Sequence, residues 1–170
     1  MNPLIYSNGV KIIDADLIDR VVRESIISPR LRASVCLHTD QSDLMQRMVM
    51  ALQPGTYMQP HKHVNPGKRE LFTIYQGRVT VVIFGEDGQI MNTYVLACDK
   101  IRTLELAAGL YHTLVPILGN TVVLEVKDGP WESVERDKTF APWAPDEGSS
   151  DVLKYQKELI YNLDSLILKK

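Results

Sequence analysis

The sequence predicts a mainly β protein, a single small sandwich or barrel with a short helix before it and a longer helix after it. Many short segments rich in strand-forming residues are separated by turn sequences such as Gln76-Gly77 and Gly85-Glu-Asp-Gly88. Short strands joined by close turns are typical of sandwiches and barrels. With 170 residues, 45% of them hydrophobic, the chain can bury one good core but not comfortably two, so we expect one domain.

The first expected element is a short helix that begins at Asp14 or Asp16. Either aspartate can accept hydrogen bonds from the free N–H groups of a first helical turn. Pro29 follows and ends the helix. The helix would have one apolar face, formed by Leu17, Ile18, Val21 and Val22.

A strand is expected from Arg30 to His38 because apolar and polar residues alternate strictly there. The polar face is either solvated or the wall of a ligand cavity. If it is a cavity wall, Arg30 or Arg32 could hold an anionic group such as phosphate through paired hydrogen bonds, with His38 beside them. The apolar face consists of Leu31, Ala33, Val35 and Leu37, and the polar face of Arg30, Arg32, Ser34, Cys36 and His38.

Further strands follow the same logic of short apolar segments between turns. Pro54-Gly55 ends the first of them, and Ala107-Ala-Gly109 and Gly119-Asn120 separate the last three. The expected strands are Met45 to Leu52, the extended segment around His61, Glu70 to Tyr75, Val79 to Phe84, Met91 to Leu96, Ile101 to Leu106, His112 to Leu118 and Thr121 to Val126.

The strand pattern fades after Asp128-Gly-Pro130. Residues 131–148 contain two tryptophans and two prolines and are predicted to pack on the β domain, as a lid, a plug or both. Ser149, Ser150 or Asp151 can then cap a final helix. Its apolar stripe should cover a core or form a dimer contact, and it consists of Val152, Leu159, Ile160, Leu163, Leu166 and Ile167.

Three potential metal ligands lie within ten residues of one another, at His61, His63 and Glu70. In an extended strand, His61 and His63 project to one face and Lys62 to the other. Divalent metals accept imidazole nitrogen and carboxylate oxygen at about 2.0–2.2 Å. The spacing therefore predicts a metal site, to which His112 could add a fourth ligand.

The alternative for the first three residues is two surface histidines and an ordinary surface glutamate. Against it, Glu70 shares a strand face with Phe72 and Ile74, so its carboxylate would point into the core, where a bare charge is costly without a cation. The alternative for His112 is a neutral core histidine, since Leu114 lies on its face. Tyr57 and Tyr75 could supply a phenolic acid or a substrate hydrogen bond near a barrel mouth, or simply pack.

Charge and composition exclude several function classes. The net charge of -2, the pI near 6.1 and the lack of a basic run give no electrostatic basis for binding nucleic acid or an anionic membrane. The chain has no leader-like start and no apolar run near the ~18 residues that span a bilayer. Cys36 and Cys98 have no zinc-type spacing. We expect a soluble, cytoplasmic protein in a reducing compartment.

The segment from Gly55 through His61, His63 and Glu70 to Gly77 resembles the first cupin motif, although the gap between His63 and Glu70 is longer than usual. The second cupin motif is similar at Gly109 and His112, with Ala107 and Pro116 at its proline and asparagine positions. Within the cupins the chain resembles the WbuC group of metalloproteins. The further segments that carry this likeness are Ser28-Pro-Arg-Leu-Arg32, Cys36-Leu-His38, Pro60-His-Lys-His63, Gly109-Leu-Tyr-His-Thr113, Gly129-Pro-Trp131 and Phe140-Ala-Pro-Trp-Ala-Pro145.

The resemblance implies a small jelly-roll barrel that holds one metal and a link to O-antigen and surface polysaccharide biosynthesis. The expected division is an N-terminal helical segment over 1–29, a cupin barrel over 30–130, and a Trp/Pro-rich segment with the final helix over 131–170, both flanking segments packed on the barrel. A homodimer is one expectation for its assembly. No catalytic residue is assigned.

Three functions remain open at this stage. The first is a metal-dependent isomerase or epimerase that acts on a sugar or nucleotide-sugar, with an anionic sugar derivative as ligand. The second is a non-haem Fe(II) dioxygenase, since histidine and carboxylate ligands with open positions also suit iron. The third is a non-catalytic module that binds or senses a small ligand. The metal would be a divalent ion of Fe, Mn, Ni, Zn or Co, because similar ligand sets bind all of them.

Overall fold

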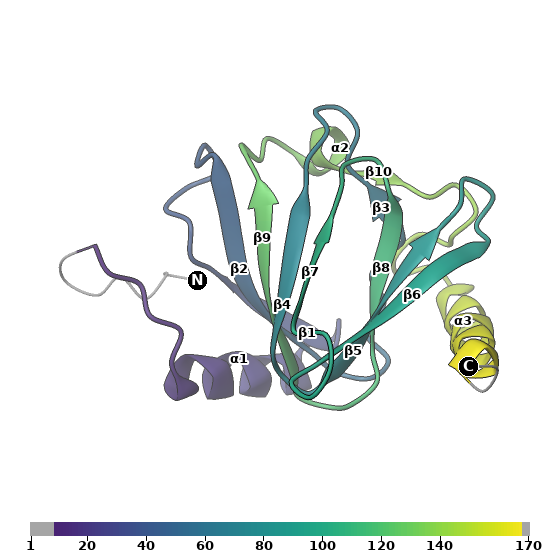
Figure 1. Ribbon diagram of the computed structural model, residues 1–170, viewed down its shortest axis with the longest axis horizontal. Helices are drawn as coiled ribbons and strands as arrows, with labels where there is room; N and C mark the ends of the chain where they lie inside the picture. Colours follow the sequence, from purple (N-terminus) through teal and green to yellow (C-terminus); the bar gives the residue numbers. More distant parts are fainter. Residues whose placement is uncertain (1–8, 168–170) are drawn as a thin grey trace.

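A computed structural model describes residues 9–167, except for the side chains of Asp164, Leu166 and Ile167. Two five-stranded antiparallel sheets face each other, and a helix lies against the outer side of each (Figure 1). The first sheet has the order β1 (Arg32–Cys36), β2 (Met45–Leu52), β9 (Thr121–Asp128), β4 (Glu70–Gln76), β7 (Thr103–Leu106). The second has the order β10 (Thr139–Phe140), β3 (His61–Lys62), β8 (Tyr111–Pro116), β5 (Arg78–Phe84), β6 (Ile90–Ala97). The predicted fold class is confirmed.

The space between the sheets holds the main hydrophobic core. Alternation along each strand sends every second side chain inward, as a sandwich requires. Phe72 and Ile74 lie on the inner face of β4, as the sequence indicated. The core residues are Met50, Leu52, Phe72, Ile74, Val79, Val81, Ile83, Leu96, Leu106, Leu114 and Val123.

The outer face of the first sheet is covered by α1 (Ala15–Ile27). Asp14 caps this helix, since its Oδ1 accepts a hydrogen bond of 2.9 Å from the N–H of Leu17. The predicted cap and apolar face are therefore confirmed. Leu17, Val21 and Val22 pack against the outward side chains of β1, β2 and β9, including Val35 and Val49.

The outer face of the second sheet is covered by α3 (Val152–Ile167) and by the segment that precedes it. The Trp143 ring lies 4.9 Å from that of Phe84 and 6.5 Å from that of Tyr155, measured between centroids. Leu159 and Leu163 are buried in the same cluster. The stripe of α3 thus covers a core at these two positions, and the dimer contact stays a prediction.

Two details differ from the sequence-based expectation. The strand expected over 30–38 is shorter, partly because Leu31 has a φ of 53°, outside the extended region. The stretch 131–148 is not free of regular structure: it contributes α2 (Val134–Asp137) and β10, which pairs with β3.

The division of the chain into segments 1–29, 30–130 and 131–170 stays a prediction. Residues 1–8 of the first segment and 168–170 of the last lie outside the described part of the chain. Within residues 9–167, none of the helices combines the length and apolarity needed to cross a bilayer.

Candidate metal centre

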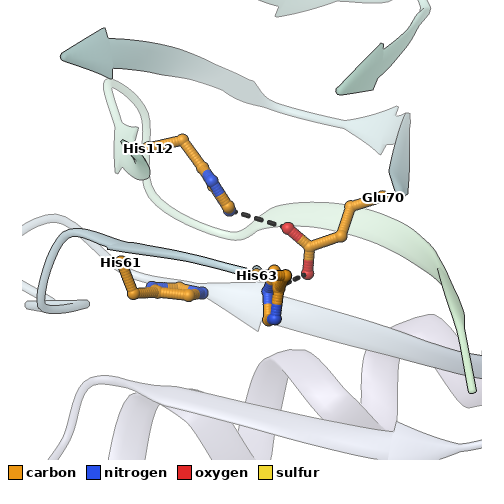
Figure 2. Close-up of side chains that lie close together, drawn as sticks. All are labelled: His61, His63, Glu70 and His112. Atoms are coloured by element: carbon orange, nitrogen blue, oxygen red, sulfur yellow. Dashed lines mark ion pairs between the residues drawn. The ribbon is translucent and has the colours of Figure 1, made fainter. Parts of the chain in front are cut away.

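Four buried side chains converge near one end of the space between the sheets: His61, His63, Glu70 and His112 (Figure 2). His61 belongs to β3 and is the register partner of His112 on β8. Glu70 begins β4 in the opposite sheet. One potential ligand atom from each residue lies within 4.8 Å of all the others. The fold therefore brings together all four residues that the sequence singled out as metal ligands.

The expected alternation around Lys62 is present. Its ammonium lies 2.6 Å from Glu86 and 4.2 Å from the centroid of the Tyr111 ring. His61 and His63 turn to the other side, with ring centroids 5.2 Å apart. The His-x-His spacing thus separates two inward imidazoles from one outward cation.

Each of the three imidazoles has its Nδ1 atom beside a backbone carbonyl. His61 Nδ1 lies 2.9 Å from the oxygen of Gln59, and His112 Nδ1 lies 3.0 Å from that of Leu110. His63 Nδ1 is hydrogen-bonded to the carbonyl of Asp137. A carbonyl can only accept, so Nδ1 carries the proton, and in the neutral ring the Nε2 lone pair is left free. This is the tautomer that a metal-binding histidine needs.

Glu70 completes the cluster but is not properly hydrogen-bonded within it. Its Oε1 lies 3.1 Å from His63 Nε2, and its Oε2 lies 2.7 Å from His112 Nε2. Nevertheless, neither His63 Nε2 nor Glu70 Oε2 has a well-oriented hydrogen-bond partner. Buried polar atoms without partners are rare and costly. A cation between the four residues would satisfy both atoms, so the donor set fits a divalent metal.

The protonation of the cluster follows from burial and from the Glu70 charge. Burial holds the pKa of His61 well below its ordinary value. Burial also acts to lower the pKa of His112, but the neighbouring Glu70 carboxylate has the larger effect, so the pKa of His112 lies above its ordinary value. For Glu70, burial acts to raise the pKa, and His112 and His63 together outweigh it and hold the pKa well below the usual range. The ionised Glu70 carboxylate and the neutral His61 imidazole are suitable ligands for a cation.

A cavity of about 580 Å³ opens beside the cluster, between the two sheets. Its walls include His61, Glu70 and His112 together with the polar face of β1. This face points inward because the apolar face of β1 packs on α1. Of the residues predicted to bind substrate, Arg30, Arg32 and His38 line this cavity. Trp131, Val134 and Phe140 line it too, so part of the Trp/Pro-rich segment lies over the cavity.

The two arginines already hold a carboxylate. Arg30 Nε lies 2.7 Å from Glu147, and Arg32 Nη2 lies 2.8 Å from the same group. Arg32 also donates a hydrogen bond of 2.6 Å to the carbonyl of Tyr57. Bidentate pairs of this kind are among the stronger polar contacts. An anionic ligand would therefore have to displace Glu147 to reach these arginines.

Tyr57 and Tyr75 do not line this cavity. The hydroxyl of Tyr57 donates a hydrogen bond of 2.7 Å to the carbonyl of Pro145, and the Tyr57 ring lines a separate apolar groove beside α3. Tyr75 follows Ile74 on β4, so the alternation that directs Ile74 inward directs Tyr75 outward, where it is exposed. We therefore leave both tyrosines out of the proposed site.

A group of charged side chains that no sequence motif marked surrounds the centre. Asp137 is fully buried and lies 2.6 Å from both Lys68 Nζ and Lys127 Nζ. Glu125 and Lys138 line the cavity. One signal was available: Glu125 and Lys127 share a strand face with Val123, and charges on a core-facing position need a partner or a function.

Comparison with known proteins gives a match at the level of the fold. The family model for a domain of unknown function, DUF6016, matches residues 13–96. A search of curated proteins gives no match. Among solved structures, the capsular polysaccharide assembling protein CapF from Staphylococcus aureus is similar with a TM-score of 0.55 and 20% identity, over 67% of this chain and 32% of that chain.

A second similar structure is salicylate 1,2-dioxygenase from Pseudoaminobacter salicylatoxidans, in complex with gentisate. Its TM-score is 0.56, with 14% identity over 76% of this chain and 37% of that chain. The chain has a cupin fold. The chain spans about a third of the length of the two structures. At these identities the likeness establishes the fold and leaves the WbuC subgroup as a prediction.

Proposed function

We propose that this cupin binds one divalent metal ion through His61, His63, Glu70 and His112 and is an enzyme that modifies a small polar molecule in the adjoining cavity. The sequence-based expectation of an anionic sugar or nucleotide-sugar is kept as the substrate class. The observation that carries the proposal is the pair of buried, unpartnered ligand atoms, His63 Nε2 and Glu70 Oε2, beside three imidazoles with suitable tautomers.

A cavity of about 580 Å³ in contact with the cluster supports catalysis or ligand binding rather than a purely structural ion. Small-molecule sites are typically concave and of about 300–1,000 Å³. Structural metal sites, by contrast, are usually closed by protein ligands. The three imidazoles and one carboxylate leave coordination positions open on an octahedral ion.

When bound, the metal would act as a Lewis acid that polarises a carbonyl or stabilises an enediolate. The chain's own residues set the conditions for this chemistry. Gln59, Leu110 and Asp137 orient the imidazoles through their carbonyls. Phe72, Met50 and Leu114 supply an apolar wall that excludes water from one side of the cavity. Glu70 supplies the negative charge that offsets that of the ion.

The neighbours' own names agree with two of the functions left open by the sequence. CapF is a capsular polysaccharide assembling protein, which supports a role in polysaccharide biosynthesis, and the second neighbour is a dioxygenase. We place the polysaccharide-related role first because the resemblance to the WbuC group points to the same process. Iron-dependent oxygenation and simple ligand binding are the competing outcomes of the experiments below.

The first test is elemental analysis of protein purified without added metals or an affinity tag. We expect about one transition-metal ion per chain. Protein that binds no Fe, Mn, Ni, Zn or Co even after incubation with each would overturn the proposal.

The metal-loaded protein is then incubated with a panel of sugars and nucleotide-sugars, with an oxygen electrode and NMR as readouts. Turnover without oxygen uptake supports the isomerase or epimerase reaction. Oxygen consumption would move the assignment to a dioxygenase. Saturable binding without turnover would identify a binding module.

A further inference from the structure

Most charged side chains that line the cavity already have partners. Arg30 and Arg32 share Glu147, and Lys127 pairs with Asp137 at 2.6 Å. Within the described part of the chain, the side chains of two charged cavity residues make no hydrogen bond or ion pair, and these residues are Glu125 and Lys138. No hydrogen bond or ion pair joins these two side chains, although their opposite charges each act on the pKa of the other.

These two residues come from opposite sides of the cavity. Glu125 lies on the inner face of β9 in the first sheet, with Phe72 and Met48 as its register partners. Lys138 follows α2 and immediately precedes β10 of the second sheet. A small molecule in the cavity can therefore contact both groups at once, and it would lie beside the metal ligands.

Electrostatics supports a role in ligand recognition. Burial is the main cause that lowers the pKa of Lys138, and the Lys138 charge in turn acts on His61 and His112. Burial also raises the pKa of Glu125, with the Glu70 charge as a second cause. Glu125 is buried and Lys138 is half-buried, and neither side chain has a hydrogen-bonded counter-charge, so both groups gain from a ligand of complementary chemistry. An anion would complement Lys138, and a hydroxyl that donates a hydrogen bond would complement Glu125.

We propose that Lys138 and Glu125 select a ligand that carries an anionic group on a polyhydroxylated carbon chain. The Lys138 ammonium binds the anionic group, a carboxylate or a phosphate, and the Glu125 carboxylate accepts a hydrogen bond from a hydroxyl. This inference rests on the proposed function, because it assigns the substrate class of the same cavity. It differs from the expectation for Arg30 and Arg32, whose charges Glu147 already satisfies.

The inference is tested by calorimetric binding of three probes to the full chain: gluconate, glucose 6-phosphate and sorbitol. Each probe is measured with metal-free protein and with protein loaded with Zn²⁺. Gluconate and glucose 6-phosphate separate the carboxylate from the phosphate, and sorbitol lacks the anionic group. We expect at least one of the two anions to bind in a saturable manner and sorbitol to bind more weakly by about tenfold or more, since an unpaired buried charge is strongly unfavourable.

Two variants and a matched control locate the site. Lys138→Met keeps the length of the side chain and removes its charge, and it should weaken anion binding by about tenfold or more, whereas Lys138→Arg should retain most of it. Lys100→Met, at an exposed turn, should bind like the wild type. Glu125→Gln should weaken the binding of the hydroxylated anions more than that of acetate, an anion without hydroxyl groups that is added as a fourth probe for this variant. Circular dichroism checks that each variant is folded.

The metal content of every variant separates this inference from the proposed function. Lys138 and Glu125 are not ligands, so we expect wild-type metal stoichiometry in their variants. If the wild type binds metal but neither anion, or if Lys138→Met binds the anions as tightly as Lys100→Met, the inference is wrong while the metal centre stands. If no metal binds but the anions bind in a manner that depends on Lys138, the inference holds and the proposal of a metal-dependent enzyme is overturned.

Discussion

Glu70 and His112 face each other from opposite sheets, with Glu70 Oε2 only 2.7 Å from His112 Nε2, and yet Oε2 has no well-oriented hydrogen-bond donor. His112 directs its Nδ1 to the carbonyl of Leu110. In the neutral ring two lone pairs then point toward the same region, and a metal ion bound between them would stabilise this arrangement. This relationship links the fold to the metal, because β4 and β8 meet only through the packing of the two sheets.

Replacing both His61 and His63 with alanine should remove bound metal without unfolding the protein. Both side chains are ligands in our proposal, and the main hydrophobic core lies elsewhere between the sheets. Elemental analysis gives the metal content and far-UV circular dichroism the fold. His38→Ala, which changes the fourth histidine of the chain, should keep its metal. Stoichiometric metal in the purified double variant would contradict the assignment.

Metal affinity should fall as the pH is lowered, and the fall should begin above 6.5, the ordinary pKa of histidine. A histidine must be neutral to coordinate, so protons compete with the metal. The Glu70 carboxylate raises the pKa of His112, so in metal-free protein His112 takes up its proton at a higher pH than an ordinary histidine. Competition with a fluorescent chelator between pH 5.5 and 8 measures the effect. An affinity that does not change over this interval would exclude coordination by His112.

Asp137→Asn should destabilise the protein by about 3–5 kcal/mol, because it leaves the buried Lys68 and Lys127 ammonium groups without their counter-charge. Metal affinity should fall as well, since the Asp137 carboxylate lies 3.7 Å from His63 Nδ1 and its pairs with Lys68 and Lys127 anchor the residue whose backbone carbonyl orients His63. The control is Asp128→Asn, which breaks an exposed pair with Arg69 and should cost less than about 1 kcal/mol. Urea unfolding of both variants is the measurement, and equal losses would contradict the role of the buried triad.

The same carboxylate predicts a pH dependence of stability. Burial acts to raise the pKa of Asp137, but Lys127 and Lys68 outweigh it, and the net pKa lies below the ordinary 3.8. A depressed pKa contributes stability that is present above the unfolded-state pKa and is lost as the pH falls through the folded-state pKa. The difference in unfolding free energy between wild type and Asp137→Asn should therefore shrink below about pH 4. A constant difference down to pH 2 would argue against ionic pairing.

Gly77→Ala should destabilise the protein more than Gly148→Ala. Both glycines have positive φ, 78° and 91°, so each substitution costs about 1–2 kcal/mol from backbone strain alone. At Gly77 an added Cβ would also lie 2.4 Å from Thr121 Oγ1 and 2.6 Å from Thr121 Cα, whereas at Gly148 nothing lies within 4 Å. Thermal unfolding of the two variants isolates the steric contribution. A Gly148→Ala variant that is equally or less stable would contradict this packing.

The sequence by itself determined the features that depend on local periodicity. The alternation of apolar residues located the strands, Asp14 and Asp16 located the start of α1 to within two residues, and the His-x-His spacing directed two imidazoles to one face. These predictions succeed because a strand has a period of two and a helix cap is a contact across three residues.

Only the tertiary structure decided which side chains meet across the cavity. It supplied Glu147 to Arg30 and Arg32, turned Tyr75 away from the cavity, and placed Asp137 against Lys68 and Lys127. These pairs join residues that are 10 to 117 positions apart. Local patterns carry no information about such distances, because the packing of one sheet on the other sets them.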